Sequence, residues 1–502
     1  MLLILITIII VTLITYIYLK PLIDNLFYSV PNEPKYIHSY IPIFGFSFQV
    51  ITNPIEFIRS LYLKYGKIFV IYFASRRWIY IYDEQTYLTK VIKSDDFITF
   101  DAFITDIFIK DLNVNSQCMQ HEESRVLQVK FFHHLLTGDE LEILSRRAHD
   151  SLIESMKFDE KALANNNNIV NFFDHFGEFM LFGGTESLFG HSFAIEQRNI
   201  TPSFYKLFQA FDQGLNLDIY GIPFRTIIYK TVFRHRNEFL KRFASFKLNN
   251  GESKLINAFE EMFRSDEYKY LFHQHDINAL HATTLWVAVS ITAPMSCWVV
   301  VDLLLHPEAL AAVKQELSEN VSSSSSIYDK EILTKLKILE SCINETLRRV
   351  FNAVVIREAL VDTTIECLDK TKIGLRKGDI VIYPAYLKHL DQNLFGSNPY
   401  RYQHDRFIKK PNQPKAPSIM IYGGGLHTCP GRFWVMNQIK ILVTLIIQHM
   451  NIEFINMTDK DKEDYRKRLP YDYSKFASAG GPKKVYKNKF DIKYSYKNLH
   501  TG

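Results

Sequence analysis

Hydrophobic positions near the start of the folded body follow two different periods. Residues 54–66 repeat apolar side chains at helical spacing, with Pro54 near the start and Gly66 at the end, and predict a helix. Residues 68–73 and 78–82 are short runs of β-branched and aromatic side chains. They predict two paired strands, with the intervening residues ASRR as the turn.

The rest of the chain is mostly helical in pattern. Helical spacing dominates from residue 120 to residue 351, and strand patterns return at residues 379–386 and 484–497. Two polar interruptions, at residues 164–168 and 322–326, predict surface loops. We therefore expect a mainly α-helical fold with a smaller β region, and no internal repeat is visible.

The first 19 residues contain no charged side chain and are long enough to cross a bilayer core. A cleavable signal peptide would need a basic start, a shorter apolar stretch and an A-x-A-like site, so an uncleaved transmembrane helix is favoured. Lys20 follows directly and places the remainder in the cytosol by the positive-inside rule. We expect an anchor at residues 1–20, a stiff proline-rich hinge at 21–45 and a catalytic domain at 46–502.

A second apolar segment, residues 277–305, is also long enough to span a membrane. It contains polar side chains along its length that argue against contact with lipid: His281, Thr283, Thr284, Ser290, Thr292 and Asp302. A helix that is buried on all sides in a large protein core has the same pattern. We predict a buried core helix here.

Composition excludes several classes of function. The chain has 502 residues, is 47% hydrophobic and carries a formal net charge of +5 with no concentrated basic stripe, so nucleic acid is not an expected partner. The cysteines are odd in number, widely spaced and never arranged as CxxC, which excludes a disulfide framework and a zinc ribbon. They are Cys118, Cys297, Cys342, Cys367 and Cys429, and a reducing compartment is expected.

One cysteine stands out because glycines crowd around it. The stretch YGGGLHTCPGRF places Gly423, Gly424, Gly425 and Gly431 beside Cys429. A thiolate that ligates a metal needs a lowered pKa and a fixed direction, which backbone N–H groups supply when they turn toward the sulfur. Glycines permit the positive φ values that such a turn uses. A helix predicted directly after the cysteine would point its positive end at the thiolate.

Two further segments make this loop specific. Glu345 and Arg348 in ETLRR are spaced to share one helix face, and Arg406 follows in YQHDRF. Together with the loop from Tyr422 to Cys429, this order resembles the cytochrome P450 family, which has an E-x-x-R helix, an arginine segment and F-x-x-G-x-x-x-C-x-G. Tyr422 replaces the usual Phe. Trp298 precedes HPE at the family spacing, so the resemblance covers nearly the whole chain.

The resemblance implies a cytochrome P450 fold with haem as cofactor and Cys429 as the axial thiolate on its iron. It implies a buried structural network of Glu345, Arg348 and Arg406. Haem-binding positions follow in the same way, with His121 standing where the family usually has Trp. They are Arg125, Arg357 and His427 toward the propionates, His121 beside them, and Tyr422, Gly423, Gly425 and Gly431 in the loop.

The predicted oxygen-activating positions depart from the family, which usually has an acid followed by threonine to relay protons. Here the two positions are Ser290 and Ile291, followed by Thr292. Isoleucine cannot relay a proton. Pro294 removes a helical hydrogen bond to the Ser290 carbonyl and predicts a kink.

This proline, together with LW upstream at residues 285–286, resembles the branch that contains sterol 7α- and 12α-hydroxylases and prostacyclin synthase. The branch usually has Asn where Ile291 stands, and the linker and the tail SKFASAGGP also resemble it. By this resemblance, residues 476–480 of the tail would line the substrate pocket.

These observations give three hypotheses of function. The first is a monooxygenase that hydroxylates a sterol or similar membrane lipid, with O2 and electrons from NADPH through cytochrome P450 reductase. The second is a lipid endoperoxide isomerase that needs no electrons, and the third is a non-enzymatic haem-binding membrane protein. The expected location is the endoplasmic reticulum membrane, single-pass, with the catalytic domain on the cytosolic side.

Overall fold

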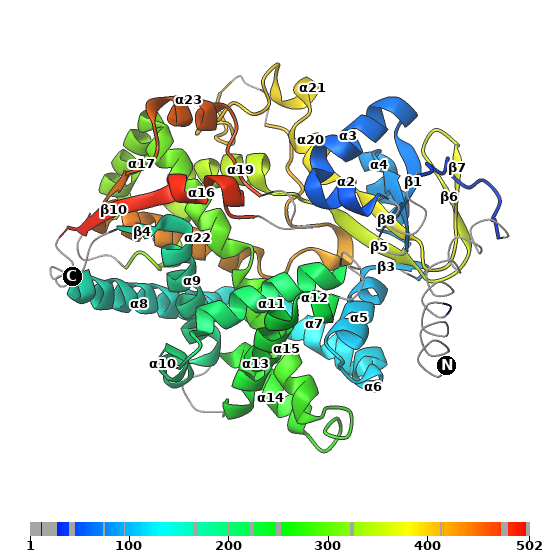
Figure 1. The fold of residues 1–502 in the computed structure, drawn as a ribbon, viewed down its shortest axis with the longest axis horizontal. Helices are drawn as coiled ribbons and strands as arrows, with labels where there is room; N and C mark the ends of the chain where they lie inside the picture. The colour runs from blue at the N-terminus through cyan, green and yellow to red at the C-terminus, as the bar shows by residue number, and fades with distance from the viewer. Residues whose placement is uncertain are drawn as a thin grey trace, which may run out of the picture.

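A computed structural model describes residue 12 and residues 28–497, and it is drawn as a ribbon in Figure 1. Gaps in the described range lie at residues 40–45, 74–75, 95, 164–168, 199, 220–224, 247–252, 322–325, 412–413, 415 and 473–479. The anchor predicted at residues 1–20 lies outside the described residues apart from residue 12. The tail loop predicted to line the substrate pocket is described only at Gly480.

Helices make up most of the described chain. In the first half they are α2 Ser47–Thr52, α3 Pro54–Tyr65, α4 Glu84–Thr86, α5 Phe100–Asp111, α6 Ser116–Gln120, α7 Glu122–Leu135, α8 Gly138–Leu163, α9 Phe172–Phe189, α10 His191–Arg198, α11 Phe204–Ile219, α12 Arg225–Ile228 and α13 Lys230–Arg242. In the second half they are α14 Lys254–Arg264, α15 Gln274–Val289, α16 Thr292–Leu305, α17 Pro307–Asn320, α18 Lys330–Lys335, α19 Lys337–Val350, α20 Ala385–His389, α21 Gln392–Phe395, α22 Arg432–His449 and α23 Asp459–Lys467. Short 3-10 and π segments complete them: η1 Tyr87–Val91, η2 Phe243–Ser245, η3 Gly425–His427 and η4 Lys484–Phe490.

The strands form three small sheets. The largest has five strands in the order β1-β2-β8-β5-β3 and lies beside α2 and α3, to the right in Figure 1. A three-stranded sheet has the order β4-β10-β9, and β6 pairs with β7. The strands are β1 Ile68–Phe73, β2 Arg76–Ile81, β3 Ile98–Thr99, β4 Ile169–Asn171, β5 Val355–Ala359, β6 Thr363–Glu366, β7 Lys372–Leu375, β8 Ile380–Tyr383, β9 Met450–Phe454 and β10 Asp491–Tyr496. The predicted mainly helical fold with a smaller β region is confirmed.

Two strand predictions need correction at their ends. β1 and β2 pair antiparallel as predicted, but Arg76 and Arg77 belong to β2 and not to the turn. Arg77 forms an ion pair with Asp379 and Arg76 with Glu358, and these pairs fix both arginines along the sheet. Within the second predicted strand segment, residues 484–497, the strand is β10 and starts at Asp491. The preceding residues form η4, where Val485 is 78% exposed, so alternation of residue types there does not correspond to burial.

The segment predicted as a hinge contacts the large sheet where it is described. The Ile37 N–H donates to the Val70 carbonyl at 2.8 Å, and the Val70 N–H donates to the Lys35 carbonyl at 3.0 Å. Glu33 forms ion pairs with Arg77 and Arg376. Residues 28–39 are therefore docked on the sheet, whereas the hinge boundary at residue 45 stays a prediction.

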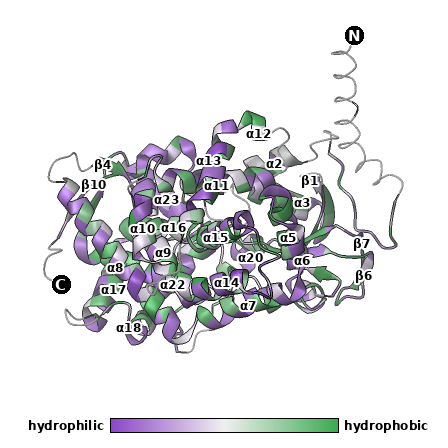
Figure 2. Ribbon diagram, turned by 90° about the horizontal axis from the view of Figure 1, so that it is seen from below, coloured by the Kyte–Doolittle hydropathy of each residue, from purple (hydrophilic) through white to green (hydrophobic). Residues whose placement is uncertain are grey.

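The buried helix predicted at residues 277–305 is confirmed. Among the described residues, Gln274–Leu305 is the helix long and apolar enough to cross a membrane, and 72% of its apolar window is buried in the protein. It lies in the interior of the helical part (Figure 2). It is also interrupted, because α15 ends at Val289 and α16 begins at Thr292. α16 contacts α9, α19 and α22, so the interruption lies at the centre of the fold.

Candidate active site

The glycine-rich loop before α22 has the tight turns that its sequence predicts at two of four positions. Gly423 and Gly425 have φ values of 70° and 69°, in the left-handed region that favours glycine. A Cβ on Gly425 would also lie 2.2 Å from Cγ2 of Ile92. The expectation of positive φ is wrong for Gly424 and Gly431, whose φ values are −168° and −82°. Gly424 has a different steric reason, since its Cβ would lie 3.1 Å from Ile92.

Cys429 lies between this loop and the N-terminus of α22. Its N–H donates to the Tyr422 carbonyl at 2.8 Å, which closes the loop. Burial raises the pKa of the Cys429 thiol, while the N–H groups of Gly431 and Arg432 and the Arg432 charge act in the opposite direction. The backbone donors are therefore where the sequence predicts them, but they do not by themselves lower the pKa. A bound cation would complete the deprotonation.

Arg357 lies on β5, directly behind the loop. Its guanidinium is 2% exposed and donates to the carbonyls of Ile356 and Gly424 at 2.8 and 3.1 Å. It also lies over the ring of Phe100, 5.9 Å from the centroid. A guanidinium forms strong charge-assisted hydrogen bonds with carboxylates, so an arginine at this position suits a carboxylate ligand beside the loop.

His427 and Arg125 converge on one carboxylate, that of Asp101 in α5. His427 Nδ1 lies 3.7 Å from Asp101 Oδ1, and Arg125 Nη2 lies 3.6 Å from Asp101 Oδ2. Arg125 and His427, two of the predicted propionate-binding residues, thus both lie beside a carboxylate, the chemical group that a propionate also carries. Asp101 could not be identified from the sequence, because no motif marks it and α6 separates its helix from the helix of Arg125.

His121 and Tyr422 complete the predicted set. The His121 ring caps α7 by accepting the Ser124 N–H at Nδ1, which leaves Nε2 as the ring donor, and it packs edge-on against Tyr268. The Tyr422 hydroxyl is buried, and within the described part of the chain it has no hydrogen-bond partner. A polar group buried in this way is expected to meet a ligand or water.

These residues fit haem on the chemistry of the donors. A thiol faces two backbone N–H groups, Arg125 of α7 and His427 of η3 converge on the Asp101 carboxylate, and Arg357 of β5 donates to the Gly424 carbonyl of the same loop. Cys429 would hold the iron, and Arg357, His427 and Arg125 would hold the propionates. We propose these residues as the haem ligands.

The structure also brings together Glu345, Arg348 and Arg406. Both oxygens of Glu345 accept from Arg348 at 2.9 Å, and Oε2 also accepts from Arg406 Nε at 2.9 Å. The Glu345 and Arg348 side chains are fully buried. Arg348 continues to the His389 carbonyl at 2.6 Å, so the network ties α19 to α20.

A second buried network next to it was not identified from the sequence. Arg349 Nη1 lies 2.6 Å from Asp302 Oδ1, and the Thr346 hydroxyl donates to Asp302 Oδ2 at 2.8 Å. These contacts join α19 to α16. The only sequence signal was Arg349 itself, adjacent to the E-x-x-R motif, together with a lone acid in an apolar helix.

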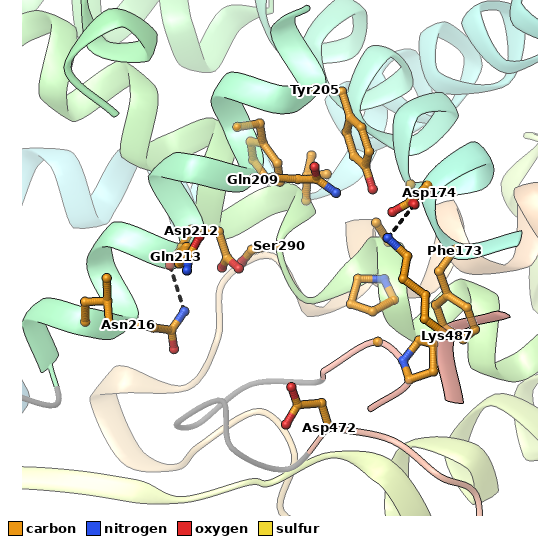
Figure 3. A pocket seen from close by; sticks show the side chains of 18 of the residues that line it. Phe173, Asp174, Tyr205, Gln209, Asp212, Gln213, Asn216, Ser290, Asp472 and Lys487 are labelled. Carbon is orange, nitrogen blue, oxygen red and sulfur yellow. Dashed lines mark hydrogen bonds and ion pairs between the residues drawn. The ribbon is translucent and has the colours of Figure 1, made fainter. Parts of the chain in front are cut away.

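The predicted proton-relay positions lie at the interruption between α15 and α16. Ser290 is 6% exposed and its N–H still donates to the Trp286 carbonyl at 2.8 Å. Ile291 packs against the core, and the fully buried Thr292 donates its hydroxyl to the Ala288 carbonyl at 2.8 Å. Val289, Ser290, Ala293 and Pro294 form one wall of a pocket of about 620 Å³ (Figure 3).

Comparison with known proteins identifies the family. The family model for cytochrome P450 matches residues 35–473. The chain therefore belongs to the cytochrome P450 family, and the predicted fold and family are confirmed. Membership supports an oxidoreductase of the monooxygenase type over a non-enzymatic haem-binding protein, and it implies a haem-thiolate cofactor.

Curated relatives confirm the branch that the sequence resembles. A 7-alpha-hydroxycholest-4-en-3-one 12-alpha-hydroxylase from Oryctolagus cuniculus is 24% identical over 456 residues, covering 85% of this chain and 88% of that protein. Prostacyclin synthase from Homo sapiens is 23% identical over 467 residues, covering 85% and 88%. Among solved structures, retinoic acid bound cyanobacterial CYP120A1 has a TM-score of 0.67 at 17% identity, covering 93% of this chain and 100% of that one.

The first prediction concerns haem retention. We expect Arg357→Ala to lower haem occupancy about twofold or more, because a buried charge-assisted contact to a propionate is lost. Arg125→Ala should cost less, since its side chain is 36% exposed and screened by water. The measurement is the ratio of haem absorbance to protein in the purified variants, with Arg357→Lys as the conservative control. Full and equal occupancy in both alanine variants would show that the arginines are assigned wrongly.

Proposed function

We propose that the chain hydroxylates a sterol or a similar membrane lipid. The observation that carries the proposal is the grouping of Cys429, Arg357 and His427 around one loop, in a chain related to the 12-alpha-hydroxylase above. Haem bound there would supply dioxygen activation, with electrons from NADPH through NADPH–cytochrome P450 reductase. The protein residues would hold the cofactor, orient the lipid and move protons.

The proposed location is the endoplasmic reticulum membrane. An uncharged stretch of 19 residues followed by Lys20 supports a single-pass anchor with the catalytic domain in the cytosol. An anchored enzyme can take an apolar substrate directly from the bilayer. This argument also supports a lipid over a soluble substrate.

A second function is favoured by one specific observation. Ile291 has no hydroxyl, and the hydroxyl of the neighbouring Thr292 donates to a backbone carbonyl. An isomerase that rearranges a lipid endoperoxide needs neither electrons nor proton delivery, so these residues would not impair it. The relationship to prostacyclin synthase agrees with this alternative.

Product yield with and without reductase separates the two functions. For a monooxygenase, we expect turnover to require NADPH and reductase, with part of the reduced oxygen lost as peroxide. Ile291→Thr should then raise the product formed per NADPH by about twofold or more, because it adds a hydroxyl at the interruption of the helix. Ile291→Val is the matched control, since it is β-branched without a hydroxyl. Full turnover without reductase would contradict hydroxylation and support the isomerase.

A further inference from the structure

The pocket beside the interrupted helix leads from the protein surface to Ser290. Its rim includes Lys487, whose side chain is 50% exposed, and the exposed Gln209 and Gln213 of α11. Its floor includes Val289 at 0% and Ser290 at 6% exposure. Figure 3 shows polar side chains from α9, α11 and the C-terminal segment pointing into this space. The pocket has a volume of about 620 Å³ and a lining of mixed polar and apolar side chains, so it has room for several water molecules beside the polar groups.

One carboxylate in the pocket lies next to the interruption. Asp212 is 7% exposed, and its Oδ1 accepts the indole N–H of Trp286 at 3.0 Å. Trp286 lies one turn before Ser290 on α15, so this contact holds Asp212 beside the end of that helix. Asp212 and Ser290 both line this pocket, and both are labelled in Figure 3.

Of the residues at the interruption, Ser290 is the one with a hydroxyl that lines the pocket. Thr292 is 0% exposed and donates to Ala288. Ile291 has no polar atom. Pro294 has no N–H to give to the Ser290 carbonyl, so the helical hydrogen bond at this carbonyl is missing and water can take its place.

Hydroxylation requires protons at a buried site. For each turnover, a lipid C–H, O2, NADPH and one H⁺ give the alcohol, water and NADP⁺, so the second oxygen atom leaves as water with two hydrogens. Protons cross an apolar interior only along polar groups and water. We propose that Asp212 and Ser290 carry protons from bulk water through this pocket to the interruption between α15 and α16. This inference rests on the proposed function.

The transfer is a simple exchange. Asp212 takes a proton from pocket water and returns it to that water, which passes a proton to the Ser290 hydroxyl. Ser290 passes its own proton on and is restored. A second carboxylate lines the same pocket, that of Asp174, which is ion-paired with Lys487 at 2.6 Å. Asp174 therefore offers a matched control for removing a carboxylate from the pocket.

The first experiment measures access without turnover. In the haem-loaded Ser290→Cys variant, we expect methanethiosulfonate reagents to label Cys at this position, the ammonium form about five- to tenfold faster than the sulfonate form. Adding Asp212→Asn should reduce this preference to about twofold, whereas adding Asp174→Asn should not. Ser296→Cys is the buried control, because Ser296 is 0% exposed in α16, on the other side of the interruption. Equal labelling of both positions, or none at Ser290→Cys, would overturn the inference.

The second experiment measures coupling with NADPH, reductase and a sterol that the enzyme turns over. We expect Asp212→Asn to lower product per NADPH about threefold or more and to raise peroxide, with Asp174→Asn close to the parent enzyme. Unchanged coupling in Asp212→Asn, with turnover still dependent on NADPH, would overturn the inference alone. Full turnover without NADPH would overturn it together with the proposed function.

Discussion

Replacing Cys429 with serine should abolish the thiolate signature in the reduced, CO-bound absorption spectrum. Cys429 lies directly before α22, and its sulfur accepts from the N–H groups of Gly431 and Arg432. A serine hydroxyl stays protonated and binds iron weakly, so both the spectrum and most of the haem should be lost. Turnover should fall below detection, because the haem supplies the redox chemistry.

A buried cysteine away from the loop provides the control for this substitution. Cys367 is 3% exposed and follows β6, so Cys367→Ser makes the same chemical change away from the loop. That variant should keep the spectrum of the parent enzyme. A Cys429→Ser protein that retains the thiolate spectrum would contradict the central assignment of this site.

The loop around Cys429 could be predicted from sequence because its conformation is local. Gly423 and Gly425 adopt the left-handed backbone that the glycine run predicts. Gly424 could not be interpreted in this way, since its constraint is the side chain of Ile92, which directly follows η1. Local backbone rules find turns, and they miss close approaches between distant segments.

Contacts between distant segments account for most of what the sequence did not reveal. Asp101, which lies between Arg125 and His427, and Asp302, which pairs with Arg349, are single acids without a motif. The Glu345 network could be predicted from the sequence, because its members are marked by local spacing and by a known motif. Two of its members are three residues apart on one helix, and the resemblance to a known family supplied Arg406.

The interruption of the buried helix combines a feature that the sequence predicts with one that it does not. Pro294 predicts it, since proline cannot donate the hydrogen bond that the helix needs, and the structure places the break four and three residues earlier, at residues 290–291. The pocket beside the break was not predictable, because its other walls come from α9, α11 and the segment before β10. The sequence thus locates the chemistry, and the tertiary structure supplies its connection to solvent.

The second large effect is expected in the buried ion network. Glu345→Gln removes the carboxylate that Arg348 and Arg406 share. The loss is costly because the side chains of Glu345 and Arg348 are fully buried. Removing one partner of such a pair costs about 3–5 kcal/mol of unfolding free energy. We expect the thermal midpoint followed by circular dichroism to fall by about 5 °C or more, and haem to be lost earlier on heating.

An exposed pair on the same protein separates this effect from the substitution itself. Glu463 is 67% exposed and lies 2.8 Å from Lys467, so Glu463→Gln removes the same charge from a pair screened by water. That change should leave the thermal midpoint almost unchanged. Adding Arg406→Gln to Glu345→Gln should recover part of the stability, because one of the two uncompensated charges is removed. Equal losses in Glu345→Gln and Glu463→Gln would show that the network does not stabilise the core.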